Sequence, residues 1–283
     1  MKVLMIGAHQ DDNEFRCGAL AHKYVKLGHR VRFLSVTNGS GGHHILSPVE
    51  TVKRRAEESR AVQEYLGIEY DIWDIEDCTV TADLETRQRL IRYIREFSPD
   101  LIITHRTNDY HADHRAVGLL VQDASYLLIV PHTCSDTPAM KDTPVIMYFE
   151  DKFKNPEFRA DVVIDADDEI DTKLHIASLN VSQVYEWLPF TTHELDDVPE
   201  DPKERFEWLK GMNITADTTD EEIMAAPRGY AVRFAKPAAR FRRELIEKYG
   251  EERGSRIRYA EAFEVCDYGK PLTEELKKEF FPF

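Results

Sequence analysis

The chain has 283 residues, of which 42% are hydrophobic and 31% charged, and this composition predicts a globular protein that buries a sizeable core. Fifty-two acidic against 37 basic residues give a net charge of −15, which argues against nucleic acid or an anionic membrane as the partner. We find no apolar run long enough to span a bilayer and no signal-peptide pattern, so we expect a cytoplasmic protein. The four cysteines, without a C-x-x-C pair, are expected to be reduced thiols: Cys17, Cys78, Cys134 and Cys266.

Short apolar segments alternate with longer segments of helical periodicity over the first 130 residues. Strands are predicted over 3–6, 31–37, 70–75 and 100–104, and helices over 14–27, 49–66 and 84–97. A Gly-rich loop, residues 38–42, follows the second strand. This β-α-β-α order predicts an α/β, Rossmann-like fold with a mostly parallel sheet and helices on both faces.

The pattern is weaker beyond residue 130, where strands are predicted over 145–149 and 162–165 and a helix over 170–181. The chain contains no Ser- or Pro-rich linker, repeat or low-complexity tract. We therefore predict a single domain over 1–283, with a motif-bearing core over 1–130 and a C-terminal extension over 131–283 that completes the substrate pocket. The sequence leaves open whether the protein is a homo-oligomer.

Histidines are concentrated at three places, each of which directly follows a predicted strand. These are His9, the pair His43 and His44, and the group His105, His111 and His114. In an open parallel sheet, the loops that leave the carboxyl ends of the strands converge on one crevice. We therefore expect these sequence-distant clusters to meet at one point.

The first cluster places two neighbouring carboxylates, Asp11 and Asp12, shortly after His9. Adjacent carboxylates point in different directions, so one can bind a cation while the other faces a bound water. A helix N-cap would account for one of these aspartates, but not for the histidine at the end of the strand.

The second cluster contains four metal-capable side chains within six residues: Asp109, His111, Asp113 and His114. Together with the first cluster it can supply two imidazoles and one carboxylate, a ligand set that suits a catalytic zinc with an open position for water or substrate. The remaining groups are then available as acid, base or orienting partner. His43 and His44 are interpreted equally well as pocket walls or as surface residues.

At these residues the sequence resembles the PIG-L or LmbE-like family of zinc-dependent N-deacetylases. The family motif A-H-P-D-D-x-E is matched by residues 8–14, with Gln10 in place of proline. The second motif, D-x-H-x-D-H, is matched in full by residues 109–114. Upstream of it, His105-Arg106 replaces the expected H-P, with one extra residue in the spacing.

The resemblance implies that His9, Asp12 and His114 hold Zn²⁺. It also implies that Asp11 is the general base toward the attacking water. A carboxylate in this role typically contributes about 10²–10⁴-fold to the rate.

His111 would, by the same resemblance, stabilise the oxyanion or protonate the leaving amine, with Asp113 orienting it. A carboxylate close to this imidazole is expected to raise its pKa and to keep it charged.

The loop after the second strand and the following helix also match the family, so that the resemblance covers about residues 3 to 130. It implies that Arg55, Asn38 and Gly39 bind the substrate. From the sequence alone, a surface pair between Arg55 and Glu58 is an equally good interpretation of this arginine.

We expect a zinc-dependent hydrolase that removes the N-acetyl group from a small-molecule substrate, an N-acetylated amino sugar or glycoconjugate of the N-acetylglucosamine type. The alternative is a zinc amidohydrolase that acts on a non-sugar amide or a thiol conjugate. A Rossmann-like nucleotide-binding module is disfavoured, because its G-x-G-x-x-G loop is absent. In its place, Asp11 and Asp12 would repel a pyrophosphate.

Overall fold

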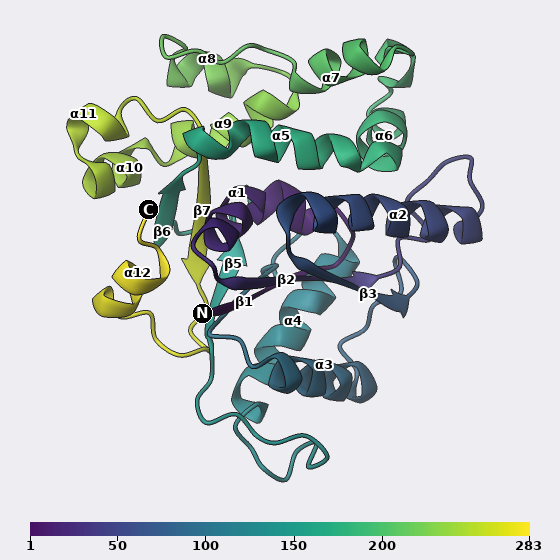
Figure 1. The fold of residues 1–283 in the computed structure, drawn as a ribbon, viewed down its shortest axis with the longest axis vertical. Coiled ribbons are helices and arrows are strands. Elements are labelled where there is room, and N and C mark those ends of the chain that lie inside the picture. Colours follow the sequence, from purple (N-terminus) through teal and green to yellow (C-terminus); the bar gives the residue numbers. More distant parts are fainter.

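The computed structural model describes residues 1–283 and contains one seven-stranded sheet, in the order β3-β2-β1-β4-β5-β7-β6 (Figure 1). Strands β1 to β5 pair in parallel, whereas β7 is antiparallel to both of its neighbours. The strands are β1 (Lys2–Gly7), β2 (Arg30–Thr37), β3 (Glu69–Ile75), β4 (Leu101–Thr104), β5 (Val145–Phe149), β6 (Val162–Asp165) and β7 (Ala260–Val265). The predicted α/β fold with a mostly parallel sheet is confirmed.

Four helices link the parallel strands: α1 (Asp12–Lys26), α2 (Pro48–Leu66), α3 (Leu84–Phe97) and α4 (Ala112–Leu127). The C-terminal half adds α5 (Ile170–Leu179), α6 (Leu188–Thr191), α7 (Pro202–Lys210), α8 (Asp220–Ala225), α9 (Tyr230–Arg240), α10 (Arg242–Tyr249), α11 (Glu251–Gly254) and α12 (Glu274–Phe280). None of these helices is both long enough and apolar enough to cross a membrane.

Each face of the sheet carries its own core. Successive side chains of a strand point to opposite faces, so Val3 and Met5 of β1 pack with α1, α2, α5 and α12, whereas Leu4 and Ile6 pack with α3 and α4. Figure 1 shows α1, α2 and α5 on one side of the sheet and α3 and α4 on the other. Burial on both faces explains why the strand segments are continuously apolar rather than alternating.

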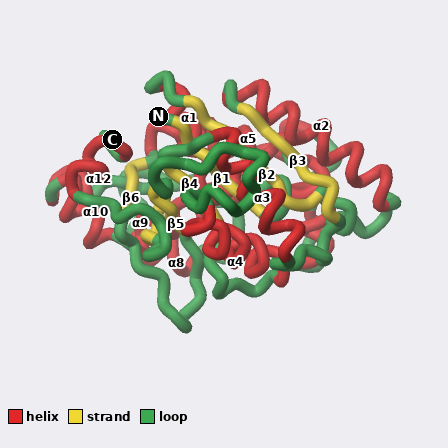
Figure 2. Tube along the Cα trace, turned by 90° about the horizontal axis from the view of Figure 1, so that it is seen from below, coloured by secondary structure: helices red, strands yellow, loops and turns green.

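The order of the strands determines where the histidine clusters lie. β4 and β2 flank β1 on either side, as can be followed in the middle of Figure 2, and the three strands run in the same direction. The loops after these strands therefore leave from one edge of the sheet.

Candidate active site

Two of the three histidine clusters meet at the carboxyl edge of β1 and β4. His9 follows β1, His105 follows β4, and His111 is the N-cap residue of α4. The imidazoles of His9 and His114 approach to 3.2 Å between Nδ1 and Nε2, although 105 residues separate them. The sheet order thus produces the expected convergence of the first and third clusters.

The side chains of His9, Asp12 and His114 have the spacing of a tetrahedral zinc site. His9 Nδ1 is 3.5 Å from Asp12 Oδ2, His114 Nε2 is 3.4 Å from Asp12 Oδ1, and the two nitrogens are 3.2 Å apart. Zinc–ligand bonds of about 2.0–2.1 Å in tetrahedral geometry place ligand atoms about 3.3–3.4 Å apart. These three residues therefore have donor atoms close enough to share a zinc ion. His111 with His9 and His114, and His105 with Asp12 and His114, form two overlapping groups whose donor atoms also lie within 4.8 Å of one another.

Two further carboxylates hold the outer nitrogens of the two imidazoles. Asp109 Oδ1 lies 3.0 Å from His114 Nδ1, and Asp113 Oδ2 lies 3.1 Å from His9 Nε2. A proton on each outer nitrogen leaves the lone pair of the inner nitrogen free for a metal, and the carboxylate makes the imidazole more basic. Asp109 is a further candidate site residue, to which the sequence analysis assigned no definite role.

The carboxylates create a strongly negative environment for the histidines. Burial by itself lowers the pKa of His9, but contacts with Asp113 and Asp12 raise it to about 10. Burial acts to raise the pKa of Asp12, but the imidazoles of His114 and His105 hold it well below its usual range. An environment that stabilises a proton on His9 in this way is also favourable for a metal cation in its place.

His105 packs against Asp12 and His114, two of the three proposed zinc ligands. The sequence analysis assigned it no role. Its ring stacks on that of His114 at 4.0 Å between centroids, and its Nε2 lies 3.2 Å from Asp12 Oδ2. Burial lowers the pKa of His105 to about 4, and the neighbouring His114 acts in the same direction. The close packing depends on Gly118 of α4, where an added Cβ would lie 2.6 Å from the carbonyl oxygen of His105.

Asp11 occupies the N-cap position of α1, but its side chain makes no capping hydrogen bond. Its φ of 116° is unusual for a non-glycine residue and costs on the order of 1–3 kcal/mol. Burial raises the pKa of Asp11 to about 6, against the opposing effect of Arg55, whose Nη2 is 3.7 Å away. A carboxylate whose pKa is close to neutral and whose side chain makes no capping hydrogen bond is suited to proton transfer.

Asp113 contacts His111 through its backbone more closely than through its carboxylate. The Asp113 carboxylate lies 3.9 Å from His111 Nδ1, and it is engaged instead by His9 and by the backbone N–H groups of Cys78 and Val80. Asp113 orients His111 through its backbone N–H, which donates to His111 Nδ1 at 3.2 Å.

This arrangement also changes the expected charge of His111. Burial, followed by the neighbouring imidazoles of His9 and His114, lowers the pKa of His111 below its usual value. Asp113 acts in the expected direction and raises this pKa, but its effect is smaller than theirs. Because Nδ1 accepts a hydrogen bond, the neutral ring carries its proton on Nε2. His111 can therefore donate a hydrogen bond without being charged.

Arg55 is buried beneath the Gly-rich loop rather than exposed on the surface of α2. Its side chain is 2% exposed, and Nη2 donates to the backbone oxygen of Gln10. An added Cβ at Gly39, where φ is +78°, would lie 2.6 Å from Arg55 Cδ. Arg55 thus connects the loop to Asp11, and the surface pair with Glu58 is wrong. Substrate contact by Arg55 stays a prediction.

The Gly-rich loop is held by its own polar contacts. Asp77, which follows β3, accepts the N–H groups of Gly39 and Gly41, and Asn38 Oδ1 accepts the N–H of Ser40 at 3.0 Å. These bonds hold the loop next to Gln10 and Arg55, beside the candidate metal ligands His9 and Asp12. Substrate binding by Asn38 and Gly39 also stays a prediction.

The pair His43 and His44 contacts the C-terminal extension instead of the metal-binding cluster. His43 Nε2 lies 2.7 Å from Glu186 Oε2, and the ring of His44 stacks on Phe190 at 4.3 Å between centroids. Arg106 is likewise structural, because it forms a bidentate ion pair with Asp151 at the end of β5.

Tyr110 is an exposed aromatic residue beside the site histidines His111 and His114. It is 71% exposed, yet its ring centroid lies 5.5 Å from that of His114 and 5.7 Å from that of His111. The sequence analysis gave it no role. Its place between Asp109 and His111 in the second motif was the only available signal.

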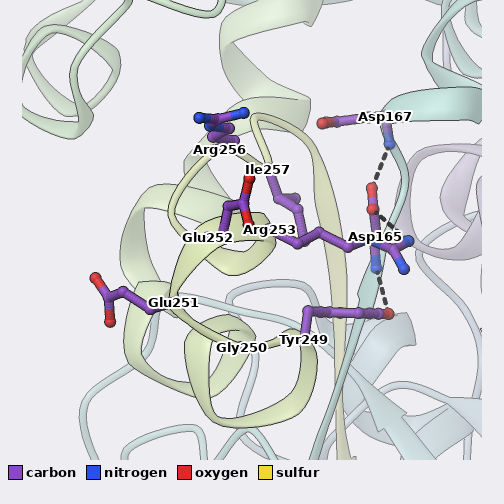
Figure 3. A pocket seen from close by; sticks show the side chains of 9 residues that line it. All are labelled: Asp165, Asp167, Tyr249, Gly250, Glu251, Glu252, Arg253, Arg256 and Ile257. Carbon is purple, nitrogen blue, oxygen red and sulfur yellow. Dashed lines mark hydrogen bonds and ion pairs between the residues drawn. The ribbon is translucent and has the colours of Figure 1, made fainter.

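A surface hollow with a volume of about 510 Å³ is formed by other elements (Figure 3). It lies between the end of β6 and the segment from Tyr249 to Ile257. Asp165 lines this hollow, and its carboxylate accepts from Arg253 and from the N–H of Asp167. None of the histidines of the two motifs lines the hollow, so it is separate from the candidate site.

Comparison with known proteins agrees with this location of the site. Residues 4–125 match the family described as PIG-L, GlcNAc-PI de-N-acetylase. The chain carries a PIG-L family domain. This domain contains both histidine–aspartate motifs and ends within α4.

Relatives of this protein include two kinds of enzyme. Diacetylchitobiose deacetylase from Thermococcus kodakarensis is 27% identical over 205 residues, which cover 67% of this chain and 74% of that protein. A 4-oxalmesaconate hydratase from Pseudomonas putida is 23% identical over 196 residues, which cover 66% of this chain and 76% of that protein. The structure of N,N'-diacetylchitobiose deacetylase from Pyrococcus horikoshii has a TM-score of 0.65 at 20% identity, and the match covers 100% of this chain and 87% of that one. These similarities support an enzyme with the LmbE-like fold.

Proposed function

We propose that this PIG-L protein is a zinc-dependent deacetylase that acts on an N-acetylated amino sugar or glycoconjugate. The observation that carries the proposal is the spacing of His9, Asp12 and His114, with the uncapped carboxylate of Asp11 beside them. When bound there, zinc would polarise the acetamide carbonyl and make the attacking water more acidic.

The protein groups supply the remaining chemistry of amide hydrolysis. Asp11 takes up the proton of the attacking water, because its pKa of about 6 leaves it largely ionised at neutral pH. His111 donates a hydrogen bond from Nε2 to the developing oxyanion. The carboxylic acid formed on Asp11 is then the group that can return a proton to the leaving amine.

Tyr110 supports a ring-bearing substrate. An aromatic side chain that is 71% exposed next to two site histidines offers a flat surface on which a sugar ring can stack. A thiol conjugate or another non-sugar amide would leave this surface uncovered.

The hydratase relative makes addition of water to an unsaturated carboxylate the competing activity, because it too requires an activated water. The test is to load the purified protein with zinc and to measure acetate release from N-acetyl sugars, N-acetylated thiol conjugates and non-sugar amides. Loss of ultraviolet absorbance by unsaturated dicarboxylates is followed in parallel. We expect acetate release from N-acetyl sugars and no hydration.

Tyr110→Ala is expected to raise KM for the sugar about 10-fold with little change in kcat, and Tyr110→Phe should behave as the wild type. Preferential turnover of an unsaturated carboxylate would replace the proposal with the hydratase activity. A KM unaffected by Tyr110→Ala would remove the argument for a stacked ring.

A further inference from the structure

A second cluster of metal-binding groups adjoins the proposed zinc triad. Donor atoms of Cys78, His111 and Asp113 all lie within 4.8 Å of one another. They come from different parts of the chain, because Cys78 belongs to the loop after β3 whereas His111 and Asp113 begin α4. The sheet order that assembles the triad therefore also assembles this group.

Cys78 differs from the other cysteines of the chain in its exposure. Cys17, Cys134 and Cys266 are buried, whereas Cys78 is exposed and has a left-handed backbone with φ of 65°. Its N–H donates to Asp113 Oδ2 at 2.7 Å, and this bond holds the loop against the carboxylate. The thiol thus lies beside Asp113 and remains accessible to an ion from solution.

The donor set determines which ion would bind. A thiolate, an imidazole and a carboxylate together suit zinc, whereas Mg²⁺ and Ca²⁺ prefer oxygen ligands alone. Binding requires the thiol to release its proton to solvent, so this site is weaker than one made of imidazoles and a carboxylate that is already ionised. We propose that Cys78, His111 and Asp113 form a second, inhibitory zinc site.

The inhibition follows from what the two shared residues do, and this step rests on the function proposed above. An ion bound to His111 disturbs the donor to the oxyanion, because it replaces either the proton on Nε2 or the N–H of Asp113 that holds Nδ1 in place. An ion held by Asp113 competes with His9, whose Nε2 lies 3.1 Å from the same carboxylate. The first zinc alone would leave His111 free to donate to the oxyanion and Asp113 in contact with His9.

The test compares wild type with Cys78→Ala, using Thr79→Ala as a control in the same exposed loop. Protein that already holds one zinc per chain is dialysed against increasing zinc and analysed for metal. We expect the wild type and Thr79→Ala to bind a second ion and Cys78→Ala to retain only the first. With Co²⁺ as the second ion, the wild type should show a thiolate-to-cobalt charge-transfer band that Cys78→Ala lacks.

Activity provides the remaining measurement. Excess zinc should inhibit the wild type, and the concentration for half inhibition should rise at least about tenfold in Cys78→Ala, whose activity at one zinc per chain stays unchanged. A second ion bound equally by Cys78→Ala, or no second ion and no charge-transfer band in the wild type, overturns the site. Metal analysis and cobalt spectra need no substrate, so a failure of the proposed deacetylation would be seen separately.

Discussion

At the scale of single residues, the neighbouring carboxylates Asp11 and Asp12 have separate environments. Asp12 faces His9 and His114, whereas Asp11 faces Arg55 and makes no capping bond. Asp12→Asn is therefore expected to weaken zinc binding, because a neutral amide is a poorer ligand. Asp11→Asn should keep zinc and lower kcat by at least about 10²-fold, as expected for loss of a general base.

Thermal unfolding of Asp11→Asn and Asp12→Asn distinguishes loss of a catalytic group from loss of stability. Asparagine tolerates positive φ, no capping bond is lost, and burial disfavours the charge of Asp11, so Asp11→Asn should not lower the melting temperature of the zinc-free protein at neutral pH. Metal analysis, kcat and thermal unfolding of both variants are the measurements. If Asp11→Asn lost zinc while Asp12→Asn kept it, the two roles would be reversed.

At the scale of elements, α1 is kinked directly after the site, at Cys17, whose φ and ψ are −143° and 20°. The carboxylate of Glu261 on β7 accepts the freed N–H groups of Ala19 and Leu20 at 3.0 and 2.9 Å, and it pairs with Lys173 of α5. Glu261 and Lys173 are 2% and 4% exposed. The C-terminal extension thus caps the second half of the helix whose first turn carries Asp12.

Glu261→Gln should lower the free energy of unfolding by about 3–5 kcal/mol, since it leaves the charge of Lys173 buried without its partner. Lys173→Met should also destabilise, and the double variant should recover part of the loss because the two side chains interact directly. Urea unfolding of the three variants measures these energies. Single variants within about 0.5 kcal/mol of wild type would show that the pair contributes little.

At the scale of the whole molecule, residues from both halves of the chain share one core. Val3 and Tyr24 pack in the same cluster as Ile176, Phe263 and Phe281, and β5 extends the sheet from β4. The prediction of a single domain over 1–283 implies one cooperative unfolding transition.

Tryptophan fluorescence can test this cooperativity, because Trp73 lies in β3 whereas Trp187 and Trp208 lie in the extension. Trp73→Phe reports on the extension alone, and the double variant Trp187→Phe with Trp208→Phe reports on the core alone. Relative to a midpoint from circular dichroism for each variant, both fluorescence signals should change together in urea. Separate transitions for the two halves would instead indicate two domains.

The sequence by itself determined the features that depend on local pattern. Apolar runs and helical periodicity located the strands of the first 130 residues and the helices α1, α2 and α3, with bounds within about two residues of those in the structure. The helix α4 (Ala112–Leu127) was not predicted. The two motifs predicted the resemblance to the PIG-L family, which matches residues 4–125. The position of the three histidine clusters after strands predicted that they meet, and the structure confirms this for the first and third clusters but not for His43 and His44. These properties are encoded in short segments or in the general geometry of parallel sheets.

Only the tertiary structure decided which side chain each polar group contacts. It paired Asp113 with His9 rather than with His111, buried Arg55 under the Gly-rich loop, and brought Cys78 to the edge of the site. It also placed β7 antiparallel between β5 and β6. These contacts join segments far apart in the chain, and their choice depends on distances of a few ångströms that no local pattern contains.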